Sequence, residues 1–382
     1  MKMWISCVGL LAVCLATLPA RGQGGKIGLD WQRNHAPGGM SLENRASALL
    51  ADGALAVLGQ QRPLAHLKDR SSDQGWIGVF AADGSLRREW AFVLQVGDAA
   101  LQDVDSFAAV GDGFVVAGVR TDGESVLVAL SADGAVRKLR SLGSQRAAFI
   151  LALPGGDLVL GGRDRRDLYA SRLRADGGVV WERRLDRGFD ELFLDGVLRD
   201  DDVVMLEHSG IREQFFMREA RVGLTTMNQA RDTIRAPDFS TEGRAGALVA
   251  AGAGYALLVD TGAGVKQNLR FVQLDKAFKQ VATAEIAAIP FALERARLAL
   301  RAERGYVVAA LDGTKLLWLD LGPTGAVVAR KESAGDRAFL HPDVVGGERT
   351  YGVATELLEV PGANEVRKLL YLVKFSSRFS SR

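Results

Sequence analysis

The amino-acid sequence predicts an all-β protein, a β-propeller most consistent with seven four-stranded blades. The chain holds 44 glycines and only 9 prolines, and this composition is typical of many tight turns. A unit made of two hairpin-like segments recurs along most of the chain. Its clearest turns lie at Asp83, Asp133 and Asp176, which are 50 and 43 residues apart, a spacing typical of propeller blades.

The first half of each unit is an apolar stretch, a turn rich in Gly and Asp, and a second apolar stretch. Such a turn between apolar runs favours a hairpin because it needs positive φ angles, which glycine adopts without strain. The first stretches are nearly continuous apolar runs, as expected for strands covered on both faces. Seven segments fit: 47–59, 106–118, 148–162, 196–208, 246–260, 297–311 and 342–356.

The second half of each unit is an apolar strand, an Asp-Gly-type turn and a charged strand. The charged strands include 87–89, 137–140, 182–184 and 330–331, and we expect them at the outer edge, where Lys and Arg discourage edge-to-edge pairing. A β-sandwich of similar hairpins is the alternative, but seven units are too many for one sandwich. The segments are 76–90, 125–141, 168–185, 215–232, 268–285, 316–333 and the stretch from Leu369 onward.

Two segments depart from the simple repeat. The last unit lacks a clear fourth strand, and residues 26–33 (KIGLDWQR) resemble the missing one. We therefore expect the N-terminal segment to complete the last blade and close the ring. Residues 291–304 contain good helix formers, although the repeat register favours a strand for their second half.

Residues 1–22 have the pattern of a secretory signal. Lys2 is followed by an apolar run over residues 3–18 and by small residues that permit cleavage after Ala20 or Gly22. An uncleaved anchor is the alternative, but 16 apolar residues fall short of the roughly 20 that span a membrane. We expect a periplasmic or extracellular protein with one propeller domain over residues 23–382 and no transmembrane helix after cleavage.

Cysteine content and charge exclude several classes of function. Cys7 and Cys14 both lie in the signal, so the mature chain is expected to contain neither disulfides nor thiolate metal sites. A lipid anchor at Cys14 is not expected, because Val13 is bulky for the position before a modified cysteine. Removing Lys2 and Arg21 leaves 46 basic residues (48 minus 2) against 46 acidic ones, and this balance gives no basis for nucleic-acid binding.

The repeat resembles those of secreted bacterial propellers of the PQQ-like and delta-sixty types. The resemblance is clearest at residues 174–181 (RADGGVVW) and covers most of the chain, although only three units match strongly. It implies a fold shared by scaffolds, binding proteins and enzymes. Quinone-dependent enzymes of this architecture use a calcium site and often a vicinal cysteine pair. The mature chain lacks cysteine, and residues 200–202 (DDD) fit a hairpin turn, so no cofactor is expected.

Known catalytic and metal-binding motifs are absent from the sequence. His35, His66, His208 and His341 are widely separated, so no metal site is expected. There is no Gly-x-Ser-x-Gly, Gly-Lys-Ser/Thr or His-Glu-x-x-His pattern, and no catalytic residue can be named. Paired carboxylates from different blades remain possible, because their sequence spacing cannot test them.

Candidate binding residues come from the loops that join second to third strands. The longest is Gln60–Gly75, since long loops on a rigid scaffold often carry function. A basic rim is not expected, because Arg120 is offset by Asp122 and Glu124, and Arg212 by Glu207 and Glu213. The candidates are Arg62, His66, Arg70, Arg120, Arg163, His208 and Arg212.

These observations favour an exported, monomeric scaffold that binds a protein or glycan partner through one face of the ring. The alternative is a propeller enzyme, a lyase or glycoside-active hydrolase, with acid and base groups meeting at the central pocket. Two or three titratable side chains gathered near the ring axis would favour the enzyme. The sequence does not identify the ligand.

Overall fold

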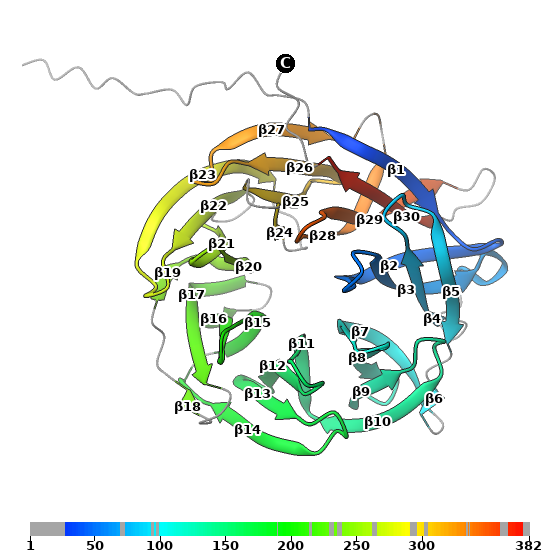
Figure 1. The fold of residues 1–382 in the computed structure, drawn as a ribbon, viewed down its shortest axis with the longest axis horizontal. Coiled ribbons are helices and arrows are strands. Elements are labelled where there is room, and N and C mark those ends of the chain that lie inside the picture. The colour runs from blue at the N-terminus through cyan, green and yellow to red at the C-terminus, as the bar shows by residue number, and fades with distance from the viewer. Residues whose placement is uncertain are drawn as a thin grey trace, which may run out of the picture.

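A computed structural model describes residues 27–376, with the exception of short internal segments. Its strands form seven antiparallel sheets arranged in a ring, which confirms the seven-bladed propeller (Figure 1). Residues 1–22, assigned to the signal, and Arg70 lie outside the described residues. The internal segments left out are 69–72, 93–94, 97–98, 189, 214–215, 229–232, 235–238, 262–265, 291–295, 302–304, 334, 336 and 360–365.

Blades 1 to 3 follow the predicted order, with the innermost strand first. Blade 1 also contains a short 3-10 helix, η1 (Leu64–His66), between its second and third strands. Blade 2 has an additional short strand, β6 (Gln95–Val96), beside β7. The strands are β2 (Met40–Leu49), β3 (Leu55–Pro63), β4 (Gln74–Phe80) and β5 (Leu86–Phe92); β7 (Ala99–Val110), β8 (Gly113–Arg120), β9 (Ser125–Leu130) and β10 (Val136–Gly143); and β11 (Gln145–Ala152), β12 (Leu158–Asp164), β13 (Asp167–Leu173) and β14 (Val179–Leu185).

Blades 4 to 6 keep this order, but two short strands share the outer position of blade 4. Both β18 (Thr233–Ile234) and β19 (Phe239–Glu242) pair with β17. The other strands are β15 (Asp190–Arg199), β16 (Asp202–Glu213) and β17 (Phe216–Asn228); β20 (Arg244–Ala251), β21 (Gly254–Asp260), β22 (Lys266–Leu274) and β23 (Gln280–Pro290); and β24 (Arg297–Leu300), β25 (Tyr306–Asp312), β26 (Lys315–Leu321) and β27 (Val327–Glu332). Strand β24 confirms the strand assignment within residues 291–304.

Blade 7 is built from both ends of the chain. It contains β28 (Ala338–Val345), β29 (Tyr351–Glu359) and β30 (Val366–Phe375), and β1 (Leu29–His35) is its fourth strand. Strand β1 pairs antiparallel with β30, from Leu29 opposite Phe375 to His35 opposite Leu370. The predicted closure by the N-terminal segment is therefore confirmed (Figure 1).

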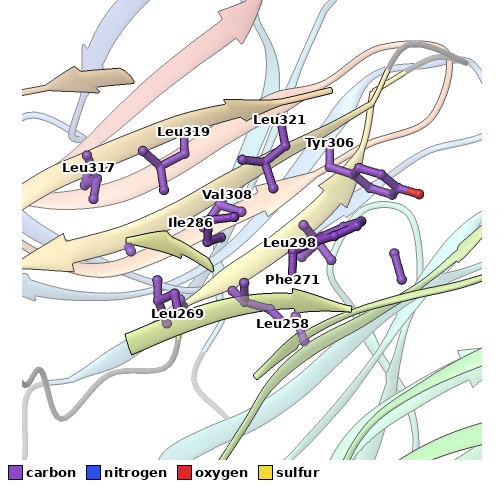
Figure 2. Packing of buried hydrophobic residues seen from close by; sticks show 14 of the residues in the cluster. Leu258, Leu269, Phe271, Ile286, Leu298, Tyr306, Val308, Leu317, Leu319 and Leu321 are labelled. Carbon is purple, nitrogen blue, oxygen red and sulfur yellow. The ribbon is translucent and has the colours of Figure 1, made fainter. Parts of the chain in front are cut away.

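The hydrophobic core lies between neighbouring blades. Figure 2 shows the cluster in which Leu258, Leu269 and Phe271 of blade 5 meet Tyr306 and Leu319 of blade 6. Comparable clusters fill the other seams, so each blade is covered on both faces by its neighbours. This explains why the inner strands are apolar without strict alternation.

The innermost strands of blades 1 to 5 and 7 contain a β-bulge. In blade 4, for example, the register shifts between Phe193 and Asp195. A bulge re-aims the following side chains. Asp195 accepts a hydrogen bond from the Leu248 amide of blade 5 (3.0 Å), and Asp343 accepts one from the Ser47 hydroxyl of blade 1 (2.5 Å). The other shifts lie at Asn44/Ala46, Leu101/Asp103, Val104/Ser106, Ala147/Phe149, Ala245/Ala247 and Leu340/Asp343.

The glycines of the repeated Asp-Gly turns are required for space as well as for φ. Gly134 has φ +84°, and a Cβ added there would lie 1.8 Å from Cδ1 of Trp90 in the preceding blade. An added Cβ at Gly84 would similarly lie 2.9 Å from the Trp31 ring. In blades 1 and 2 the turn therefore packs against an aromatic side chain of the preceding blade.

We expect Gly134→Ala to lower the free energy of unfolding by about 2–4 kcal/mol, since positive φ strain adds to overpacking against Trp90. Gly123→Ala is the matched control, because Gly123 also has positive φ (+86°) but no heavy atom within 4 Å of an added Cβ. The control should cost only about 1 kcal/mol. Urea unfolding of both variants measures the difference, and equal losses would contradict the packing role.

Candidate functional site

The seven blades give the ring two distinct faces. Because neighbouring strands are antiparallel, second and third strands are joined on the same face on which the chain passes to the next blade. We call this the connecting face; at blade 1 it carries residues 36–39 and 64–68. The opposite face, here the hairpin face, carries turns such as 50–54 and 81–85.

A cluster of charged side chains lies on the connecting face where blade 7 meets blade 1. Glu43 is near the start of β2, the innermost strand of blade 1, and is mostly buried. Its Oε1 lies 2.6 Å from Nε2 of His341 in β28, and its Oε2 accepts a hydrogen bond from Nζ of Lys368 in β30. Arg45 Nη2 is 3.2 Å from the same carboxylate. We call Glu43, Arg45, His341 and Lys368 the seam cluster.

The backbone at His341 is locally strained. His341 has φ +50°, in the left-handed region that non-glycine residues seldom adopt. It is followed by Pro342, which has no amide hydrogen for the strand ladder, and the register shifts between Leu340 and Asp343. The side-chain amide of Asn44 donates to the His341 carbonyl (3.0 Å) and holds this conformation. Strain of this kind recurs at functional sites.

Electrostatics keep the Glu43 carboxyl ionised. Burial alone would raise its pKa, but the hydrogen bond from His341 and the charges of Arg45 and Lys368 lower the pKa far below its ordinary value. Exposure of the His341 and Lys368 side chains is 31% and 32%, so both side chains remain reachable from solvent.

The seam cluster continues into the long connection of blade 1. Arg45 donates to Gln60 Oε1 (2.6 Å), and Gln60 donates to Asp73 Oδ2 (2.9 Å). Asp73 also accepts two hydrogen bonds from Arg62, whose Nη1 donates to the Leu67 carbonyl (2.5 Å). Strand pairing runs through Pro63 and resumes at Gln74, so the predicted loop Gln60–Gly75 is shorter than expected.

The structure brings two of the predicted residues near this cluster. Arg62 lies in β3, within the network just described, rather than in a loop. His66 lies in η1 and is exposed. Arg120, the last residue of β8, lies 2.8 Å from Asp122 and 2.7 Å from Glu124, which confirms the predicted offset.

The loop assignment was wrong for the other described candidates. Arg163 lies in β12 opposite Arg146, and His208 lies in β16 opposite Leu192, where it is 8% exposed. Arg212 is also in β16, opposite Met217. Polar residues at the ends of second strands still take part in the backbone ladder, so polarity did not mark a loop.

No member of the seam cluster is among the binding residues predicted from the sequence. Glu43 and His341 are 298 residues apart, and only ring closure brings them together. One signal was available: Pro342 within a predicted inner strand indicates a bulge, and bulges re-aim side chains.

Three further observations complete the description of the structure. Within the described parts of the chain, no group of three or more His, Cys, Asp or Glu side chains is arranged to hold a metal ion. A shallow cavity of about 290 Å³ lies away from the seam cluster, at the outer rim between Thr241 of β19 and Arg270 and Glu285 of blade 5. No helix among the described residues is long and apolar enough to span a membrane.

Comparisons with known proteins identify the fold. No family model matches the chain. No curated protein matches it in sequence. The structure is similar to the Pan2 WD40 domain of Neurospora crassa, with TM-score 0.53 and 13% identity over 87% of this chain and 89% of that one. It is also similar to the Dos1 propeller (TM-score 0.50, 7% identity, 91% and 94%) and to a structure of Drosophila Plexin A in complex with Semaphorin 1b (0.50, 8%, 93% and 88%). These similarities show a β-propeller fold.

Proposed function

We propose that this propeller is an exported, non-enzymatic scaffold that binds a protein or glycan partner at the seam cluster on the connecting face. The observation that carries the proposal is the grouping of the Arg45, His341 and Lys368 side chains around the Glu43 carboxylate, beside the innermost strands β2 and β28. With Arg62 and Asp73 included, three permanent cations (Arg45, Arg62, Lys368) meet two carboxylates (Glu43, Asp73), which leaves one excess positive charge. The group that docks there should therefore be acidic.

The fold and the repeat are consistent with this role. Propeller rings resembling this one occur in proteins such as Plexin A, whose structure was determined with Semaphorin 1b. The PQQ-like and delta-sixty resemblance is part of the same proposal, as is export directed by residues 1–22. N-terminal sequencing of the protein from the cell envelope should find a chain that starts at Arg21 or Gln23.

Binding can be tested with a double variant, Arg45→Met/Lys368→Met. The mature chain is immobilised and probed with acidic and neutral glycans and with proteins from the same compartment. Loss of both cations should weaken binding at least tenfold, because charge-assisted hydrogen bonds to the partner are removed. Arg137→Met on the hairpin face is the control, since Arg137 is 54% exposed and should not contribute. Equal binding by the wild type and the double variant would refute the proposed site.

One specific observation favours the alternative, a propeller enzyme. The Glu43–His341 pair is the arrangement in which a carboxylate orients an imidazole for general acid–base work, and it lies on two innermost strands. A lyase or glycoside-active hydrolase acting on an acidic glycan would fit. If His341→Gln left a detected activity unchanged, the enzyme hypothesis would be lost.

A further inference from the structure

A second cluster of buried charge lies across the ring, between blades 3 and 4. Glu191 is near the start of β15 and is 2% exposed; Glu207 in β16 is 4% exposed. Glu207 is paired with Phe193, and Glu191 is two residues before Phe193, so the three side chains share one face of blade 4. Phe193 packs against Phe149 and Trp181 of blade 3, which places both carboxyls in this seam.

Both carboxyl oxygens of Glu207 have hydrogen-bond partners. It accepts a hydrogen bond from Nη1 of Arg187 (2.6 Å) and another from the Thr225 hydroxyl (2.5 Å). Its side chain lies over Gly223, since an added Cβ there would be 3.0 Å from Glu207 Cγ. In blades 1 and 3, the equivalent pairs are Gly59 with Trp76 and Gly162 with Tyr169. Blade 4 thus has a carboxylate in a seam where its sister blades have an aromatic ring.

Glu191 has far fewer partners. Its Oε2 accepts one long hydrogen bond, from the Arg187 amide (3.3 Å), and its Oε1 has no hydrogen-bond partner among the described residues. Its own amide donates to the Arg166 carbonyl in blade 3 (2.9 Å), and this hydrogen bond links blade 4 to blade 3. Burial raises the pKa of Glu191 to about 7, with the charges of Glu207 and Asp186 adding to the effect and Arg187 opposing it.

The Arg187 guanidinium is therefore shared by two buried carboxyls: it donates a hydrogen bond to Glu207 and acts on Glu191 through its charge. Other charged groups near them include Asp186 beside Arg187, Arg166, which is paired with Asp190, and Arg221 of β17, which shares a strand row with Glu191 through Ser209. An ionised Glu191 would need a second positive charge, and the guanidinium of Arg187 is already bound to Glu207. A proton bound to Glu191 supplies this positive charge, neutralises the carboxylate, and needs almost no additional space.

We propose that protonated Glu191 holds blades 3 and 4 together; we call this proton-dependent contact the catch. With its proton, the neutral carboxyl is compatible with burial, and the seam stays closed at the connecting face. When the O–H bond ionises and the proton passes to solvent, two carboxylates face one guanidinium, and the start of β15 separates from blade 3. The catch does not depend on the seam cluster, which lies between blades 7 and 1.

The direction in which stability changes with pH follows from the raised pKa of Glu191. In the unfolded chain, Glu191 titrates near its ordinary pKa of 4.5. Below that value the carboxyl is neutral in both states, and stability is complete. Between 4.5 and about 7 the native state retains a proton that the opened state releases, so stability falls as pH rises and levels off above the native pKa.

Hydrogen exchange of the full chain tests the catch. Glu191→Gln keeps the shape and removes the titration, so the Glu191→Gln variant is the reference at each pH. Protection of the amides at residues 190–194 in the wild type, relative to this variant, should fall on the order of 100-fold between pH 5 and pH 8. Asp186→Asn is the matched control; it removes a nearby exposed charge and should retain the decline.

The same experiment contains the results that would overturn the proposal. Identical pH profiles for the wild type and Glu191→Gln would do so. If the Glu191→Gln variant does not fold, carbon-13 NMR titration of the wild-type glutamate carboxyls decides instead, and a Glu191 midpoint below pH 5 would exclude the catch. Recovery of protection at pH 8 on adding Ca²⁺ to the wild type would show that the site takes a metal cation and not a proton.

Discussion

A chain that begins at Ala36, and so lacks β1, should lose roughly 5 kcal/mol or more of its free energy of unfolding relative to a chain that begins at Gln23. Strand β1 pairs with β30 along its length. Its side chains also contact blade 1. Trp31 Nε1 donates to the Ala82 carbonyl (2.9 Å), and His35 Nε2 lies 3.0 Å from the Glu89 carboxylate. Removing the strand exposes the edge of β30 and removes these contacts between blade 7 and blade 1.

Thermal and urea unfolding of the two chains measure this loss. A synthetic peptide of residues 27–36 added to the shortened chain should restore most of the stability, because the β30 edge and the blade 1 contacts remain available to it. Trp31→Ala in the chain that begins at Gln23 is a milder change, and its free energy of unfolding should lie between those of the two chains. If the shortened chain unfolds at the same urea concentration as the control, the ring is closed by other contacts and β1 is dispensable.

Asp320→Ala should cost about 3–5 kcal/mol, the typical effect of leaving one partner of a buried ion pair uncompensated. Arg301 and Asp320 form this pair in blade 6, and their side chains are 4% and 3% exposed. Arg301 also donates to the Ser376 carbonyl just after β30, while the Ser376 amide donates to the Gly28 carbonyl (3.0 Å). The pair therefore supports the point at which both chain ends meet.

Urea unfolding of three variants separates the ion pair from general damage. Arg87→Ala is the control, because Arg87 and Asp52 form an exposed pair that should contribute no more than about 1 kcal/mol. The double variant Arg301→Met/Asp320→Leu should be less destabilised than Asp320→Ala alone, since no buried charge is left unpaired. A double variant as unstable as the single one would show that packing, and not charge, explains the loss.

Local sequence was sufficient for the ring itself. The turns at Asp83, Asp133 and Asp176 require glycine next to them, and each turn joins strands that are neighbours in the chain. The charged strand at residues 87–89 forms the outer edge of its blade, as expected. Closure by residues 29–35 was also predictable, because the last repeat lacks its fourth strand.

Only the tertiary structure decided where the charges meet. Glu43 and His341 belong to the first and last blades, and their contact depends on closing the ring in one register. Glu191 and Glu207 became a buried pair because the register of β15 against β16 places both on the face that packs against blade 3. Short-range spacing specifies hairpins, but burial and charge pairing depend on which blade faces which. The sequence by itself therefore determined the shape of this protein, and the assembled ring determined its candidate sites.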